Sequence, residues 1–163
     1  ADRLMPRVRS SDSTIASLIA HGYARSPTFH RLVDIIDATN GIVYVEPGHC
    51  PHGVRACMAM SVTVAGGYRI LRIVVDPRKA TDWDLMALIG HELWHAVEVL
   101  RDPSLTSDMA VRLFYERVGH QPLPERHRKL WETDAAEQAD RDVRTELRKY
   151  RKAMSNLIQP TTR

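Results

Sequence analysis

The chain has 163 residues, of which 44% are hydrophobic and 26% are charged. This length suits one domain that can bury a core, and the balance of apolar and charged residues excludes a wholly disordered chain. No apolar run approaches the roughly 20 residues that a membrane-spanning helix needs. We therefore expect one soluble domain over residues 1–163, with no membrane as its partner.

The first part of the chain carries two helix patterns. Within residues 12–23, apolar side chains recur at helical spacing on one side. A second helix is expected to begin at Ser26 and Pro27, because serine caps a helix N-terminus and proline suits its first turn. Gly41 follows the last apolar position and is typical of a helix end.

Residues 42–75 have the composition of β-strands. Residues 42–45 predict a short buried strand. Two further β-branched runs, residues 58–65 and 68–75, flank Gly66 and Gly67, which is a two-residue signal for a β-hairpin. These three strands predict a small antiparallel sheet.

The remaining elements are expected to be helices. The strongest pattern spans residues 81–102, where Thr81 and Asp84 form the two ends of a capping box. Further helices are expected at residues 107–118 and 127–154, with a turn-rich connection between them. The order α-α-β-β-β-α-α-α defines an α+β domain.

The net charge of +3 and the pI near 9.1 come from the last predicted helix. Residues 126–152 hold nine Lys or Arg and six Asp or Glu, a surplus equal to that of the whole chain. Such a mixed surface is typical of a solvated helix face. Aromatic residues do not alternate with the basic ones, which argues against a nucleic-acid partner.

Cys50 and Cys57 lie seven positions apart in a segment rich in glycine and proline, so a disulfide between them is sterically easy. The chain begins with Ala1 and Asp2 rather than with Met, as a chain does after removal of a signal peptide. Together these features predict a secreted or periplasmic protein. Two reduced thiols in a cytosolic protein are the alternative.

The segment most informative about function is the motif HExxH within the predicted helix 81–102. Its residues are His91, Glu92 and His95. A spacing of four places both imidazoles on one helix face, where they can bind one Zn²⁺ ion. Glu92 is then placed to take a proton from a metal-bound water as a general base. The composition gives a chance match of only about 2%.

Catalytic zinc usually has three protein ligands and one open position. Glu132 is the first candidate for the third ligand, because the small residues after it allow close helix packing; Glu116 and Glu137 are alternatives. Glu98 lies on the same helix as the histidines, and three ligands from one straight helix do not converge easily. We expect Glu98 to orient a ligand or to face solvent.

A hairpin, an HExxH helix and a later glutamate resemble the gluzincin group of zinc metallopeptidases. The resemblance covers roughly residues 58–140. It implies a zincin-like fold and one zinc ion held by His91, His95 and Glu132, with Glu92 as the base. It also implies that a peptide or protein substrate lies extended along a sheet edge within residues 58–75. No HxxGxxH continuation follows His95, which excludes a third histidine ligand of the metzincin kind.

Other roles remain open at this stage. An oxyanion stabiliser could come from any of four side chains, with Tyr115 and His120 preferred over His127 and Tyr150. Asp134 or Asp140 could orient a zinc-binding histidine. The expected function is zinc-dependent endopeptidase activity. The alternatives are a zinc-binding domain without catalysis that serves a partner or a regulatory role, and an intracellular protease acting on proteins bound to nucleic acid.

Overall fold

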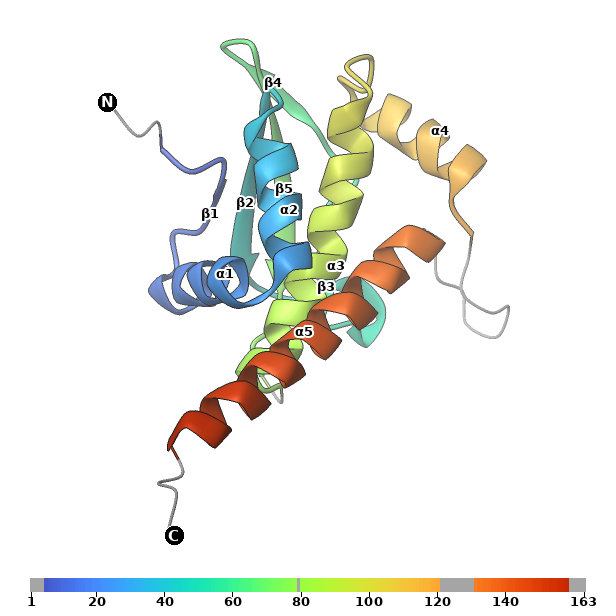
Figure 1. Cartoon of the computed structure of the whole chain (residues 1–163). Coiled ribbons are helices and arrows are strands. Elements are labelled where there is room, and N and C mark those ends of the chain that lie inside the picture. Colours follow the sequence, from blue (N-terminus) through green and yellow to red (C-terminus); the bar gives the residue numbers. More distant parts are fainter. Residues whose placement is uncertain (1–4, 79, 121–130, 159–163) are drawn as a thin grey trace, which may run out of the picture.

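The computed structural model describes residues 5–78, 80–120 and 131–158 (Figure 1). This part of the chain is an α+β fold of five α-helices and a five-stranded mixed sheet. In chain order the elements are β1 (Val8–Arg9), α1 (Ser13–Arg25), α2 (Pro27–Asp37), β2 (Gly41–Pro47), a 3₁₀ turn (Pro51–Gly53), β3 (Ala56–Met58), β4 (Thr63–Ala65), β5 (Tyr68–Val75), α3 (Asp82–Arg101), α4 (Asp108–Val118) and α5 (Asp134–Ile158).

Side-chain caps mark the starts of the first three helices; those at Ser26 and Thr81 were predicted, and that at Asp12 was not. Asp12, Ser26 and Thr81 each accept a hydrogen bond from a backbone N–H of the first turn that follows. At α3 the box is complete, since the side chain of Asp84 also accepts from the backbone of Thr81. Local side-chain chemistry therefore sets these helix starts.

The sheet is mixed, so the expected antiparallel sheet was wrong. The strand order is β1-β2-β5-β3, with β4 also paired to β5. β1, β2 and β5 run parallel, whereas β3 and β4 run antiparallel to β5. In β2 and β5 every second side chain is buried. Both strands turn that side toward the helices, and this shared buried face sets their pairing rather than any local turn.

The predicted hairpin forms, but its first arm is broken. Gly66 and Gly67 have φ of 55° and 80°, which is the left-handed backbone that the two-residue turn requires. The expected strand 58–65 is instead divided into β3 and β4. Between them the chain bends inward, where Val62 is buried and its N–H donates to Asp108 at 2.9 Å. This bend leaves β3 as the outer strand at one edge of the sheet.

The helices α1, α2 and α3 contact one another and the sheet, and α5 lies across α3 (Figure 1). Gly90 on α3 permits this crossing, because a Cβ there would lie 2.9 Å from a methyl carbon of Val143 on α5. α5 begins at Asp134 rather than at the expected residue 127, and residues 127–130 lie outside the described chain. None of the described helices is long and apolar enough to span a membrane.

Candidate metal centre

Three potential metal ligands meet where α3 passes beneath the segment that leads into α5. His91 and His95 project from one face of α3, and Glu132 lies two residues before α5 begins. The Oε2 atom of Glu132 is 2.9 Å from Nε2 of His91 and 3.7 Å from Nε2 of His95. Among the described residues, these three form a group whose ligand atoms all lie within 4.8 Å of one another.

The backbone near Glu132 explains why this glutamate reaches the histidines. Glu132 and His120 exchange two backbone hydrogen bonds of 2.9 Å, which fasten the segment before α5 to the end of α4. Glu116 is exposed on α4, and Glu137 lies 3.8 Å from Arg141 on α5. The group that could hold a metal therefore contains Glu132 and neither alternative.

Glu98 contacts His95 at Nδ1, the ring nitrogen that does not face Glu132. Its Oε2 lies 2.9 Å from Nδ1 of His95. The two oxygens of Glu98 also accept hydrogen bonds from Trp94 Nε1 (2.9 Å), Tyr115 Oη (3.1 Å) and Thr133 Oγ1 (2.6 Å). A carboxylate at Nδ1 fixes the imidazole with Nε2 free to bind a metal. Glu98 thus takes the orienting role for which Asp134 and Asp140 had also been considered; these two pair instead with His120 and Arg144.

The charge balance of this group depends on Glu132. Burial opposes protonation of His95, but the carboxylates of Glu132 and Glu98 outweigh it and raise the pKa of His95 to about 10. The pKa of His91 is also raised, because Glu132 and Glu92 outweigh its burial. Burial similarly opposes ionisation of Glu132, yet the two imidazoles lower its pKa to about 2. The two imidazoles therefore favour the ionised form of Glu132, and Glu132 favours the protonated form of each imidazole.

The donor set fits a divalent cation. Two imidazoles and one carboxylate form one of the ligand sets that catalytic Zn²⁺ has. Zinc–ligand bonds of about 2.0–2.1 Å put tetrahedral ligand atoms about 3.3 Å apart, close to the distances that join Glu132 to His91 and His95. Although Oε2 of Glu132 is buried, it has no well-aligned hydrogen bond from a described residue. A bound cation would satisfy this oxygen.

Glu92 lies beside the three ligands and is almost fully buried, with 6% of its surface exposed. Burial raises the pKa of its carboxyl group above the ordinary value, against the opposing influence of His95 and His91. The backbone N–H of Met58 on β3 also contributes a hydrogen bond to this carboxylate. Glu92 is therefore a carboxyl group with an increased affinity for a proton, fixed between the histidines and the edge strand.

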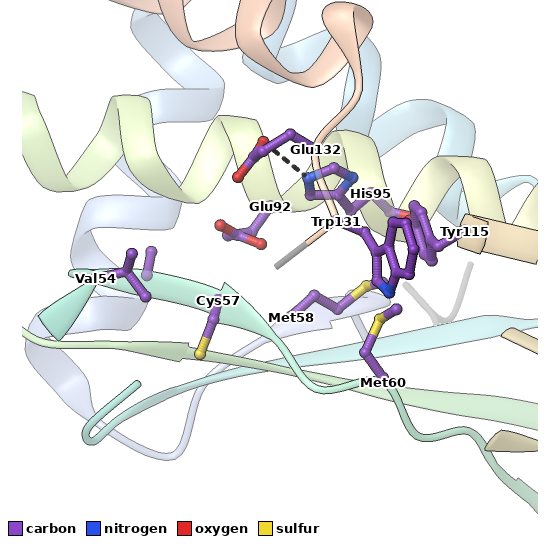
Figure 2. Close-up of a pocket in the computed structure, with 10 residues that line it drawn as sticks. Val54, Cys57, Met58, Met60, Glu92, His95, Tyr115, Trp131 and Glu132 are labelled. Carbon is purple, nitrogen blue, oxygen red and sulfur yellow. Dashed lines mark hydrogen bonds and ion pairs between the residues drawn. The ribbon is translucent and has the colours of Figure 1, made fainter. Parts of the chain in front are cut away.

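Two hollows adjoin this group and share part of their lining. The first, about 60 Å³, is lined by Glu92, His95 and Glu132 together with apolar side chains that include Met60 and Trp131 (Figure 2). The second, about 290 Å³, shares Glu92 and Glu132 and has His91 on its wall. The candidate ligands therefore border these hollows, rather than lying sealed within the core.

The strand β3 forms the wall opposite α3. The two residues that flank β3 are hydrogen-bonded to the β5 side of the sheet: Asp76 N donates to Arg55 O, and Ala59 N donates to Arg72 O. By strand alternation, the backbone groups of Ala56 and Met58 point away from β5, toward the candidate ligands. Two short strands, β3 (Ala56–Met58) and β4 (Thr63–Ala65), each pair with β5 alone and form this edge of the sheet, whereas β5 lies inside it. That a substrate lies along an edge within 58–75 stays a prediction.

The side chains considered for an oxyanion role lie in different places. Tyr115 is buried on the wall of the smaller hollow, and its hydroxyl is within hydrogen-bond distance of His95 O (3.0 Å) and Glu98. His120 lies 3.2 Å from Asp134. Tyr150 is on α5 beside Arg25, and residue 127 lies outside the described chain. The hydroxyl of Tyr115 is turned toward the α3 backbone and Glu98.

The predicted disulfide joins Cys50 and Cys57, whose Cα atoms are 5.9 Å apart. It closes the loop that contains the 3₁₀ turn and most of β3. Residues of this loop, among them Val54 and Ala56, line both hollows. The covalent link is therefore part of the wall that faces the candidate ligands.

No protein-family model, curated protein or solved structure matches this chain. The description of this site therefore rests on its residues and their geometry alone. The sequence motif HExxH identified two of its three ligands, and the role of Glu98 is visible in sequence only as its position three residues after His95 on the same helix.

Proposed function

We propose that this chain is a zinc-dependent peptidase in which His91, His95 and Glu132 bind the metal. The observation that carries the proposal is the approach of Glu132 Oε2 to both Nε2 atoms, with Glu92 buried beside them. Bound zinc would supply a Lewis acid that acidifies water and polarises a peptide carbonyl. The resemblance to gluzincins supports the same assignment.

Glu92 is the proposed general base. Its carboxylate would take one proton from the attacking water and pass it to the leaving amine, so that one water is consumed and an acid and an amine are released. A carboxyl group whose burial raises its pKa is suited to carry that proton between the two steps. The geometry also supplies a place for the substrate, because an extended peptide could pair with the outward backbone groups of Ala56 and with the carbonyl of Met58.

The disulfide between Cys50 and Cys57 supports an oxidising location for this activity, as a secreted or a periplasmic protein. It favours an extracytoplasmic peptidase over an intracellular protease acting on proteins bound to nucleic acid. A zinc-binding domain without catalysis shares the same ligand group, and it would differ in making no use of Glu92.

The test combines metal content with peptide cleavage. The purified chain should bind one zinc ion, and His91→Ala should lose it. The zinc-loaded chain should cleave peptides from a mixed-sequence library, and a chelator should abolish cleavage reversibly. Glu92→Gln should keep zinc but lower the cleavage rate by at least about a hundredfold, while the exposed control Glu116→Gln should be unchanged.

Each failure has a separate meaning. Zinc binding without cleavage by the native chain would identify a non-catalytic metal domain. Cleavage that survives Glu92→Gln at full rate would show that another group is the base. A chain that takes up no zinc would contradict the whole proposal.

A further inference from the structure

The C-terminal third of α5 carries an apolar stripe that nothing in the described chain covers. Val143 and Leu147 are buried on the inner side of α5. At steps of three and four residues the same side continues through Tyr150, Met154 and Leu157, as helical periodicity requires. Tyr150 is half-buried, whereas Met154 and Leu157 are 41% and 78% exposed. The same side of α5 thus stays apolar from its buried part at Val143 and Leu147 to its exposed part at Met154 and Leu157.

The charges of this segment all have one sign. Residues 147–158 contain four cations, Arg148, Lys149, Arg151 and Lys152, and no acidic residue. None of these four forms an ion pair with a described residue. By contrast, Arg144, one turn earlier, is paired with both Asp84 and Asp140. Within α5, the cations without an ion pair to a described residue therefore lie at residues 148–152, just before the exposed part of the stripe.

The stripe faces a step in the molecular surface. α5 continues beyond the start of α3, so its last turns project past the helical layer (Figure 1). At the corner, beside the exposed part of the stripe, a hollow of about 260 Å³ is lined by Thr81, Trp83 and Asp84 at the start of α3 and by Arg144, Leu147, Arg148 and Arg151 of α5. Arg25, from the end of α1, lies between the rings of Trp83 and Tyr150. Trp83 gives the step an apolar wall, and Arg148 and Arg151 lie along its edge.

We propose that this step, formed by residues 147–158 of α5 and the start of α3, binds an acidic amphipathic helix of a partner protein. The apolar side chains of that helix would cover Met154 and Leu157. Its carboxylates would pair with Arg148 and Arg151. This surface lies away from the candidate metal ligands, so the proposal does not depend on the proposed peptidase activity.

Charge and shape select this occupant over two others. A second copy of the same segment would bring four more cations against the first four, which is unfavourable in a low-dielectric contact. A flat anionic bilayer would meet the protein body first, because the exposed stripe lies on the side of α5 that packs against α3. A helix of about 10 Å diameter can enter the step beside α5.

The test measures binding of the full chain to a labelled probe by fluorescence anisotropy. The probe is a peptide of about 18 residues with leucine at helical spacing and glutamate on the remaining positions. We expect saturable binding that weakens with added salt. A matched peptide with lysine in place of glutamate should not bind, and a glutamate peptide without leucine should bind at least about tenfold more weakly.

Paired variants locate the contact. Leu157→Ser with Ile158→Ser should lower the affinity at least about tenfold, whereas Asn156→Ala, on the opposite side of the same turn, should not. All three positions are exposed, so folding should be retained, and circular dichroism checks this. Arg148→Gln with Arg151→Gln should also weaken binding.

Three outcomes would overturn the proposal. The first is equal binding of the glutamate and lysine peptides. The second is no binding of the glutamate peptide together with co-sedimentation on vesicles that contain anionic phosphatidylglycerol, which would assign the surface to lipid. The third is self-association that Leu157→Ser with Ile158→Ser abolishes, which would assign the surface to a second copy of the chain.

Discussion

Thr133 donates its hydroxyl proton to Oε1 of Glu98 over 2.6 Å, and the other oxygen of Glu98 holds Nδ1 of His95. One hydrogen bond thus connects the residue after Glu132 to the carboxylate that orients a histidine on another element. The two parts of the candidate metal site are therefore fixed relative to each other before any metal binds.

Loss of this connection should weaken metal binding. Thr133→Val keeps the shape of the side chain but removes the hydroxyl donor. We expect the zinc affinity to fall about tenfold, because hydrogen bonds behind a ligand contribute on that scale. Competition with a chromophoric chelator measures it. Thr145→Val, at an exposed position of α5, is the matched control; equal affinities for the two variants would contradict the expectation.

The choice of Glu132 as the third ligand can be tested directly. Glu132→Ala should lower zinc affinity by at least about a hundredfold, more than the loss of an orienting residue does. Glu137→Ala should leave zinc binding unchanged, since Glu137 faces Arg141 on α5. Zinc per chain after dialysis provides the measurement. Zinc retained by the first variant and lost by the second would move the ligand to Glu137.

Zinc binding should release protons and strengthen as pH rises. In the metal-free chain the neighbouring carboxylates outweigh burial and raise the pKa values of His91 and His95, that of His95 to about 10, which favours the protonated form of each imidazole. Zinc must displace these protons. The affinity therefore falls as pH decreases and increases as pH rises through the neutral range. Calorimetry at several pH values, in buffers of different ionisation enthalpy, counts the protons; a pH-independent affinity would contradict the prediction.

Arg69 should be essential for stability. Its buried guanidinium donates to the last carbonyls of α3 and beyond, including Leu100 O and Asp102 O at 2.7 Å each. Arg69→Met leaves these acceptors unpaired, and we expect a loss of about 3 kcal/mol in the free energy of unfolding. Arg72→Met, exposed on the same strand, should cost little. Urea denaturation of both variants measures the difference, and equal denaturation midpoints for Arg69→Met and Arg72→Met would refute the prediction.

Reduction of the disulfide should also destabilise the chain. The bond joins residues seven apart, and closing such a short loop restricts the unfolded chain by about 2.5 kcal/mol. Cys50→Ser with Cys57→Ser should lower the free energy of unfolding by about this amount. Because the loop lines both hollows, cleavage of peptides should decrease as well. An unchanged denaturation midpoint in the double variant would count against this role.

The sequence predicted the features that local chemistry determines. Capping side chains marked the starts of two helices, at Ser26 and Thr81; Gly66 and Gly67 marked the hairpin, and the HExxH spacing marked two ligands. The parallel pairing of β2 with β5 was missed, because it joins strands 28 positions apart in the register Gly41 to Arg69 and depends on the shared buried face. β1 was missed because a two-residue strand has no periodicity to detect.

The surroundings of the ligands were only partly predictable. Glu132 was the preferred third ligand because of the small residues after it, although it lies before α5 and not on it. Its position depends on the backbone pairing with His120, which no local pattern encodes. Likewise, Glu98 receives donors from Tyr115 and Thr133, and sequence alone could not show that these residues come together.

The contacts of α5 have a consequence for how the chain matures. Glu146 accepts hydrogen bonds from Ser26 and Thr28, about 120 positions earlier, and Val143 covers Gly90 on α3. While a nascent chain is still emerging from the ribosome, α2 and α3 lack this cover and His91 and His95 lack Glu132. Loading of a metal with its full ligand set can therefore occur only after the chain as far as Glu132 has left the ribosome.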